Sequence, residues 1–254
     1  MFSIQPRSET VFTIICSVSL LGGIVPAYAM PNSVDTEQLL ALDHQQFSFI
    51  PPEDSGQPRT NRAGGRRDQF CNNSMPTPSL TLLLPPTNQG LTTAAHPTFL
   101  AYLPQTSAKQ AFLTLEDEDD NYLYHTIFEL PAGAGIIGIP IPDTAPALEA
   151  DKYYKISLAM ICGQVLDPND PVVEGWIKRV ELDTQSRPSQ EISLELGAWY
   201  ASNGIWFDTL QTLADLYEVE PDHAIAAWEA LFRSVNLDDM GAAVFLGNVN
   251  NTVN

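Results

Sequence analysis

The sequence predicts a β-rich fold with a helical appendix: an antiparallel β-sandwich, immunoglobulin-like or fibronectin-like, followed by a small C-terminal helical segment. Two patterns support this prediction. Between Leu80 and Leu182, seven short runs rich in β-branched and aromatic residues are separated by turn residues, which is typical of a sandwich. After Leu182, apolar residues recur at steps of three and four, the period of an amphipathic helix. The two patterns meet in Val172–Leu182.

These patterns divide the chain into five parts. With 254 residues, 44% of them hydrophobic, the chain is long enough for one large domain or for one domain plus a small one. We expect a signal peptide at 1–29, a disordered polar and basic linker at 30–75, the β-sandwich at 76–182, a helical segment packed on the sandwich at 183–246, and a frayed tail at 247–254.

The first residues predict export. Arg7 precedes an apolar run from Val11 to Val25, and Ala27-Tyr28-Ala29 ends the run with the small-x-small pattern of a signal-peptidase site. The alternative is a membrane anchor, but about fifteen apolar residues are fewer than the roughly twenty that a span needs. We therefore expect cleavage after Ala29, a periplasmic or extracellular protein, and no membrane span in the mature chain.

The charge of the chain argues against nucleic-acid binding. The sequence has 31 acidic and 12 basic residues, a net charge of -19. From Asp68 onward the balance is 25 acidic to seven basic residues, a field that repels phosphate backbones. A cluster of arginines precedes this region, at Arg59, Arg62, Arg66 and Arg67. It is either a contact with an anionic surface or, as is more common, a flexible basic linker.

Two cysteines, Cys71 and Cys162, remain after the predicted cleavage. An even number of cysteines in an exported protein predicts a disulfide between them. The alternative is two unrelated thiols. Because there is no Cys-x-x-Cys motif and no histidine near either residue, we predict no metal, cofactor or redox site.

The seven predicted strands are Leu80–Leu84, Pro97–Leu103, Gln110–Leu115, Tyr122–Leu130, Ile136–Ile141, Tyr153–Cys162 and Val172–Leu182. In the sixth, Tyr154, Ile156 and Leu158 fall on one face, and Lys155 and Ser157 fall on the other. The last strand is ambiguous, because Trp176 shares its face with charged as well as apolar residues.

The approach to the sixth strand resembles a tyrosine corner. Leu148 precedes Tyr153 by five residues, and in such corners the phenol bonds back to the preceding loop. The alternative is a strand that simply begins with tyrosine.

The link Glu116–Asn121 between the third and fourth strands is rich in carboxylates. Carboxylates are calcium ligands, but the run lacks the glycine and the distal glutamate of an EF-hand loop. We predict a solvated hairpin tip and no metal site.

Periodic apolar residues predict helices around Ile192–Tyr200, Phe207–Tyr217 and from Pro221 onward. A unit of about sixty residues is marginal alone, so the helices should dock on the sandwich. We expect Trp206 and Trp228 in the core, with Trp176 and Trp206 at the interface.

No catalytic residues are predicted. The four histidines, His44, His96, His125 and His223, are scattered, and no Gly-x-Ser-x-Gly, His-Glu-x-x-His or Walker-type motif occurs. The architecture favours a non-catalytic extracytoplasmic binding or interaction module, with an unknown protein or envelope component as its partner. The alternatives are an envelope structural protein and a hydrolase that acts on an envelope polymer through a carboxylate pair.

Five stretches resemble the signature segments of domain-of-unknown-function family 928, which is typical of cyanobacteria. They are Pro86–Thr92, His96–Phe99, Leu115–Asp119, Val173–Leu182 and Ala201–Asp208. The resemblance runs from about Pro76 to Leu246 and implies an exported protein of unestablished activity, with no catalytic residues to carry over. Asp119-Asp120 stands where relatives are expected to have an Asp-Gly turn.

Overall fold

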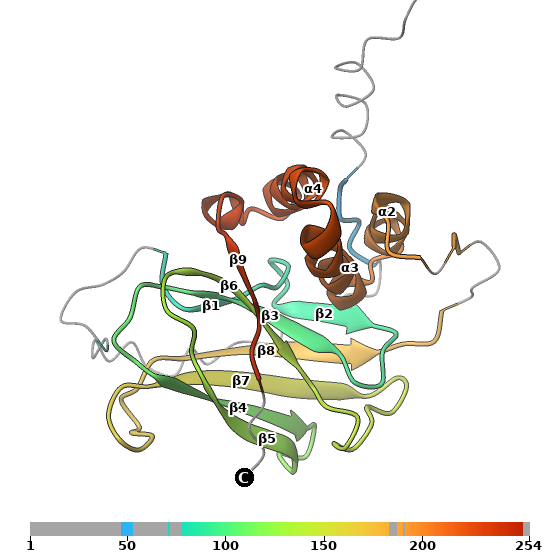
Figure 1. The fold of residues 1–254 in the computed structure, drawn as a ribbon. Helices are drawn as coiled ribbons and strands as arrows, with labels where there is room; N and C mark the ends of the chain where they lie inside the picture. Colours follow the sequence, from blue (N-terminus) through green and yellow to red (C-terminus); the bar gives the residue numbers. More distant parts are fainter. Residues whose placement is uncertain (1–46, 53–70, 72–77, 183–186, 190, 251–254) are drawn as a thin grey trace, which may run out of the picture. The chain divides into compact units, whose positions relative to one another are not determined.

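The computed structural model describes residues 47–52, 71, 78–182, 187–189 and 191–250 (Figure 1). These residues belong to one compact unit, Thr36–Asn254, and a second unit, Met1–Asp35, lies outside the described ranges. The predicted signal peptide and the arginine cluster therefore fall outside what the structure describes. Within the described ranges, no helix is long and apolar enough to cross a membrane.

The described part of the chain is β-rich, with nine strands in two sheets. The strands are β1 (Thr81–Leu82), β2 (Gln89–Thr92), β3 (Thr98–Leu103), β4 (Gln110–Asp117), β5 (Tyr122–Glu129), β6 (Gly135–Pro140), β7 (Tyr153–Ile161), β8 (Val172–Arg179) and β9 (Phe245–Asn248). The four-stranded sheet has the order β1-β3-β6-β9, and the five-stranded sheet has the order β2-β8-β7-β4-β5. All seven predicted strands are present.

Two strand pairs are parallel, contrary to the predicted all-antiparallel arrangement. β2 runs parallel to β8, with Gly90 opposite Ile177, and β9 runs parallel to β6. Sequence periodicity does not predict either of these edge strands, because each has four residues, one of them glycine, and neither shows strict alternation. Each of these edge strands is held in its sheet by hydrogen bonds to a neighbouring strand, β2 to β8 and β9 to β6.

The C-terminal end also differs from the predicted frayed tail. Gly247 and Asn248 belong to β9, and the Val249 N–H donates to the Gly138 carbonyl (2.8 Å). Val249 is buried. Pairing with the edge of β6 therefore holds this segment in place. Of the predicted tail, residues 251–254 alone lie outside the described ranges.

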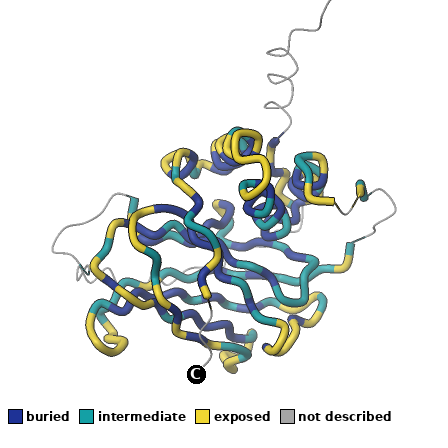
Figure 2. The backbone as a smooth tube through the Cα atoms, in the orientation of Figure 1, coloured by how far each residue is buried: buried dark blue, intermediate teal, exposed yellow. Residues whose placement is uncertain are grey.

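The core lies where the inward faces of the strands meet, and the strand centres are buried while most loops are exposed (Figure 2). In β7 the predicted alternation is confirmed: Tyr154, Ile156 and Leu158 are buried, whereas Lys155 and Ser157 are partly exposed. The apolar side chains of β4 and β6 complete this core, Leu113, Leu115, Ile136, Ile137 and Ile139 among them.

A tyrosine corner is present, but the residue is Tyr154 and not the predicted Tyr153. The Glu149 N–H donates to the Tyr154 hydroxyl (3.0 Å), so the phenol ties β7 to the loop before it. Tyr153 faces the other way: its hydroxyl accepts a hydrogen bond from Gln89 (3.5 Å), and Lys178 lies over its ring. The alternation in β7 already places Tyr154 on the face of Ile156 and Leu158; the spacing from Leu148 selected its neighbour instead.

In β8 the inward face is Gly175 and Ile177, which are buried, and Trp176 lies on the outer face and is only half-buried. The expectation that Trp176 is buried at the junction with the helices is therefore not met. The physical reason is strand phase: Trp176 pairs with Lys155, which also faces outward.

The helices among the described residues are α2 (Leu194–Ser202), α3 (Trp206–Val219) and α4 (Pro221–Ser234), followed by the short 3-10 helix η1 (Asp238–Met240). Ser193 caps α2 by accepting from the Leu196 N–H (3.2 Å), and Pro221 begins α4. Helix α3 packs against the strands, with Phe207 edge-on to Phe99 of β3 at 5.4 Å between ring centroids.

Two of the four tryptophans are buried in this helical layer. Trp206, fully buried, donates from Nε1 to the Leu83 carbonyl (2.8 Å). Trp228 is 4% exposed and packs edge-on against Phe232 of the same helix. The ring of Phe245 in β9 lies 6.1 Å from Trp228, so α4 packs against the C-terminal strand.

Part of the predicted linker is ordered. Residues 47–52 run along the helices, and Phe47 and Phe49 are buried. The composition of residues 30–75 is polar, but these two phenylalanines find apolar partners that are more than a hundred residues away in sequence. The expectation of disorder is therefore wrong for this segment.

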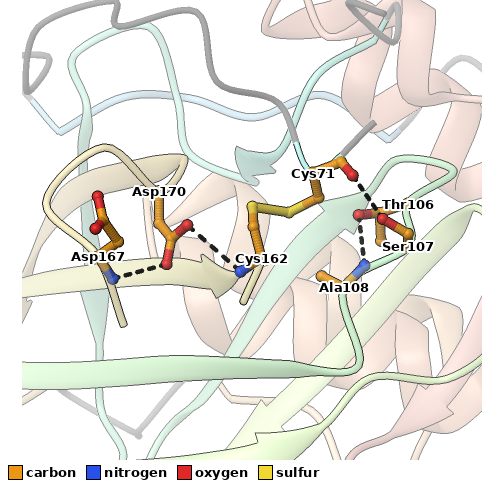
Figure 3. The surroundings of a disulfide bond; sticks show 7 residues. All are labelled: Cys71, Thr106, Ser107, Ala108, Cys162, Asp167 and Asp170. Atoms are coloured by element: carbon orange, nitrogen blue, oxygen red, sulfur yellow. Dashed lines mark hydrogen bonds between the residues drawn. A yellow bond between two sulfur atoms is a disulfide. The ribbon is translucent and has the colours of Figure 1, made fainter. Parts of the chain in front are cut away.

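The structure joins Cys71 to Cys162 by a disulfide, the pairing that the sequence predicts (Figure 3). The Ser107 hydroxyl donates to the Cys71 carbonyl (2.6 Å), and the Cys162 N–H donates to Asp170 (3.4 Å). The two cysteines are 91 residues apart in sequence, and in the chain-entropy model a loop of this size stabilises the fold by about 4.5 kcal/mol. The bond ties the N-terminal approach of the chain to the end of β7.

Candidate functional site

The candidate site lies where α3 meets the end of β2. Gly90 lets the helix approach: a Cβ at this position would lie 2.6 Å from Phe207 Cε2 and 3.0 Å from Trp206 Cδ1. No side chain larger than hydrogen fits there unless the helix shifts. The first turn of α3 is therefore in direct contact with the backbone of β2.

Asp208, in that first turn, fastens the helix to the strand. Its carboxylate accepts hydrogen bonds from the Thr92 hydroxyl (2.7 Å), the Thr93 N–H (3.1 Å) and the Thr93 hydroxyl. Burial raises the pKa of Asp208, while the hydrogen bonds from Thr93 and Thr92 act in the opposite direction. A carboxylate in the first turn is also favoured by the helix dipole.

Arg179 extends this polar junction to the end of β8. Its Nε donates to the Thr93 carbonyl (3.3 Å), and one terminal nitrogen donates to the Leu148 carbonyl (2.7 Å). Because Thr93 also binds Asp208, the three segments β8, the β2–β3 link and α3 share one hydrogen-bonded network. Thr93 is the residue at its centre.

Two hollows flank Tyr200 of α2. The first has a volume of about 320 Å³ and is lined by Thr92, His96, Ile192, Leu196, Tyr200, Asp208, Gln211, Thr212, Asp215 and neighbouring residues. The second has a volume of about 300 Å³ and is lined by Thr93, Arg179, Val180, Glu181, Leu182, Arg187, Trp199 and Tyr200. Both volumes are near the lower limit for small-molecule sites.

The first hollow contains a carboxylate pair. Asp215 accepts a hydrogen bond from Gln211 Nε2 (2.6 Å), and burial raises the pKa of Asp215. Asp208 is seven residues earlier on the same helix, which corresponds to about 10 Å along the axis. The buried Gln211 Oε1 has no hydrogen-bond partner among the described residues.

The second hollow combines cations with aromatic rings. The Arg187 guanidinium lies 5.2 Å from the centre of the Tyr200 ring and donates to the Tyr200 hydroxyl. Burial raises the pKa of that hydroxyl, as does the charge of Asp208. Arg187 Nε is buried without a hydrogen-bond partner among the described residues. Trp199 adds a second ring, 5.3 Å from that of Tyr200.

The site draws on four of the five signature stretches. Gly90 and Thr92, His96, Arg179, and Trp206 with Asp208 come from these four stretches and meet around α3. Sequence reasoning found the stretches but assigned them no role. It placed Tyr200 in a periodic helix without a site role, and it missed Arg187 and Gln211, because nothing in the local sequence of these two distinguishes them from surface residues.

The other sequence candidates lie elsewhere. His96 Nε2 is 3.0 Å from the Ala145 carbonyl oxygen and lines the first hollow, whereas His125 lies on β5 and His223 at the start of α4. His44 is outside the described residues. Tyr153, Trp176 and Trp228 line neither hollow.

The acidic hairpin Glu116–Asn121 forms its own internal contacts. Asp117 accepts hydrogen bonds from the backbone N–H groups of Asp119 and Asn121 (both 2.9 Å), and the Asn121 contacts lower its pKa. Lys155 bridges Glu116 (2.5 Å) and Asp120 (3.1 Å). Among the described residues, no group of three or more His, Cys, Asp or Glu is arranged to hold a metal ion.

Asp208 should make the stability of the folded protein depend on pH. Its pKa in the folded state lies above the unfolded value of about 3.9. Its contribution to stability is therefore fully present below about pH 4 and is lost as pH rises through the folded-state pKa. We expect the wild type to lose stability relative to Asp208→Asn between pH 4 and pH 7 in thermal unfolding curves.

Asp208→Ala should cost about 3 kcal/mol below about pH 4, because it leaves the Thr93 N–H and two hydroxyls without an acceptor, and the difference from the wild type should shrink as the pH rises. The exposed Asp119→Asn, in the hairpin between β4 and β5, serves as the control and should follow the wild type. Stability curves for the wild type and Asp208→Asn that stay parallel across this pH range would contradict the assignment.

One family model matches residues 62–244, and its description is Domain of Unknown Function (DUF928). No curated protein matches the chain. The matched region contains every described strand except β9, the three described α-helices and all of the residues that line the two hollows. The chain therefore belongs to the DUF928 family.

Proposed function

We propose that this protein is a non-catalytic, extracytoplasmic binding module whose site is the pair of hollows around Tyr200. The observation that carries the proposal is that each hollow has a buried polar atom without a partner, Gln211 Oε1 in one and Arg187 Nε in the other, among the described residues. Buried polar atoms are nearly always hydrogen-bonded. After a small side-chain rotation, a bound ligand would supply the missing donor and acceptor.

An immunoglobulin-like scaffold is part of this proposal. The pairings β1-β3-β6 and β8-β7-β4-β5 correspond to the A-B-E and G-F-C-C′ orders of such sandwiches. The tyrosine corner supports the same assignment, because Tyr154 is the second residue of β7, the strand that corresponds to F. Sandwiches of this kind commonly serve as recognition domains at cell surfaces.

A hydrolase is less well supported than a binding module. A carboxylate pair does line the first hollow, as the hydrolase alternative requires. However, Asp208 accepts hydrogen bonds from Thr92 and Thr93 that hold α3 on β2. These hydrogen bonds already engage the Asp208 carboxylate. Asp215 is then the carboxylate of the pair that remains to face a substrate.

The alternative of an envelope structural or interaction protein has its own supporting observation. Ile127, Phe112, Ala159 and Val172 are aligned in register across β5, β4, β7 and β8, on the outer face of the sheet. Ile127 is 44% and Val172 38% exposed. Such an apolar row suits a protein partner.

Export is the second part of the proposal. Its support is the signal-like segment that ends at Ala29 together with the Cys71–Cys162 disulfide, a bond that is typical of oxidising compartments. We expect the native protein, isolated from the periplasmic or extracellular fraction, to begin at Met30 by intact-mass measurement. Reduction should add the mass of two hydrogen atoms. A species that retains Cys16, or one with two free thiols, would refute this part.

The ligand site is testable with isotope-labelled mature protein and a panel of neutral disaccharides, uronic-acid disaccharides and blocked dipeptides. We expect at least one compound to shift the amide resonances of Trp199 and Tyr200. Arg187→Ala should weaken the binding of that compound at least tenfold, because the substitution removes both the guanidinium charge and the unpaired N–H donor.

Arg233→Ala is the matched control, since Arg233 is exposed on α4 and lines neither hollow. It should bind as the wild type does. Amide-resonance shifts confined to the β5–β4–β7–β8 face would favour the alternative of an interaction protein. Binding that Arg187→Ala does not affect would contradict the assigned site.

A further inference from the structure

Residues 47–52 lie as an extended segment among the three helices (Figure 1). The Phe49 N–H donates to the Ser234 hydroxyl at the end of α4 (3.1 Å), and the Ile50 N–H donates to the Ala201 carbonyl in α2 (3.1 Å). The backbone of the segment is thus bonded to two different helices. Extended peptides bound in grooves use main-chain hydrogen bonds of this kind.

The side chains of the segment alternate. Phe47 and Phe49 are buried, at 5% and 6% exposure, while Ser48 and Ile50 are exposed, Ile50 at 56%. This is the period of two expected for a strand-like peptide with one face in contact. The ring of Phe49 packs edge-on against Trp206, 4.9 Å between centroids.

Two glycines shape the groove to this peptide. A Cβ at Gly197 of α2 would lie 2.9 Å from Phe47 Cζ, and a Cβ at Gly204 would lie 2.9 Å from Pro52 Cδ. The free volume that remains beside Phe49, Pro51 and Pro52 is about 10 Å³, which is at the limit for a single water molecule. The peptide therefore fits the groove closely at both ends.

A long connection joins this segment to the rest of the described chain. Residues 53–70, eighteen in number, connect Pro52 to the disulfide-bonded Cys71, a stretch that can span at most about 60 Å. The region matched by the family model begins at residue 62 and so excludes the segment. The hydrogen-bond partners of the Phe49 and Ile50 N–H groups lie more than 140 residues away in sequence.

We propose that the groove between α2, α3 and α4 is a peptide-binding site and that Phe47–Pro52 is its tethered ligand. The partner that fits is an extended peptide with two aromatic residues two positions apart, followed by prolines. The tether raises the local concentration of the resident segment to the millimolar range, so the groove is occupied in the intact protein. This inference is independent of the hollows around Tyr200.

The test uses the full mature chain with a specific protease site inserted after Gly56. After cleavage, the fragment that carries Phe47–Pro52 is no longer covalently joined to the body, because the disulfide lies on the other side of the cut. We expect the fragment to co-elute with the body at high concentration in gel filtration. Excess synthetic peptide of residues 45–54 should displace it.

Substituted peptides define the specificity. A peptide with Phe49→Ala should displace the fragment at least tenfold less well, since it loses the contact with Trp206. A peptide with Ile50→Ala, altered at an exposed position, should act as the unchanged peptide does.

Three results would overturn the proposal. A fragment that separates at once at every concentration is not a ligand. A fragment that excess peptide cannot displace is not exchangeable. A body that unfolds when the fragment leaves would show that the segment is an integral part of the core.

Discussion

The contact between the first turn of α3 and strand β2 is the constraint on which the rest of this structure depends. β2 is an edge strand of four residues, and its glycine brings the backbone against Trp206 and Phe207. Asp208 then uses the free donors of Thr92 and Thr93 at the strand's end. The helical layer is too small to be stable alone, so this contact couples its folding to that of the sandwich.

The same contact creates the candidate binding surface. Because α3 lies against β2, α2 stands beside the ends of β2 and β8, and Tyr200 separates two hollows of similar size but different chemistry. One has carboxylates and an amide, and the other has two guanidinium groups and two aromatic rings. In a chain with a net charge of -19, the second hollow is lined by two arginines, Arg179 and Arg187, and one acidic residue, Glu181.

The sequence predicted the strands of the sandwich, the helices and the disulfide, because each depends on local periodicity or on a simple count of cysteines. Its alternation placed Tyr154 on the inward face of β7, but the spacing from Leu148 assigned the corner to Tyr153, because which phenol reaches the preceding loop depends on tertiary contacts. It missed β2 and β9, whose hydrogen bonds depend on neighbours and not on their own pattern. Phe47–Pro52 was assigned to a linker because its stabilising contacts are all distant in sequence. The unpaired atoms of Arg187 and Gln211 follow from tertiary packing alone.

Native-state hydrogen exchange tests most directly whether the helices and the sandwich form one cooperative unit. The amides of Leu210 and Leu213 in α3 and of Ile156 and Leu158 in β7 are the informative set, because all four side chains are fully or almost fully buried. A single unit predicts the same opening free energy for both groups. If the α3 amides exchange with an opening free energy several kcal/mol lower while the β7 amides stay protected, α3 unfolds independently of the sandwich and the account is wrong.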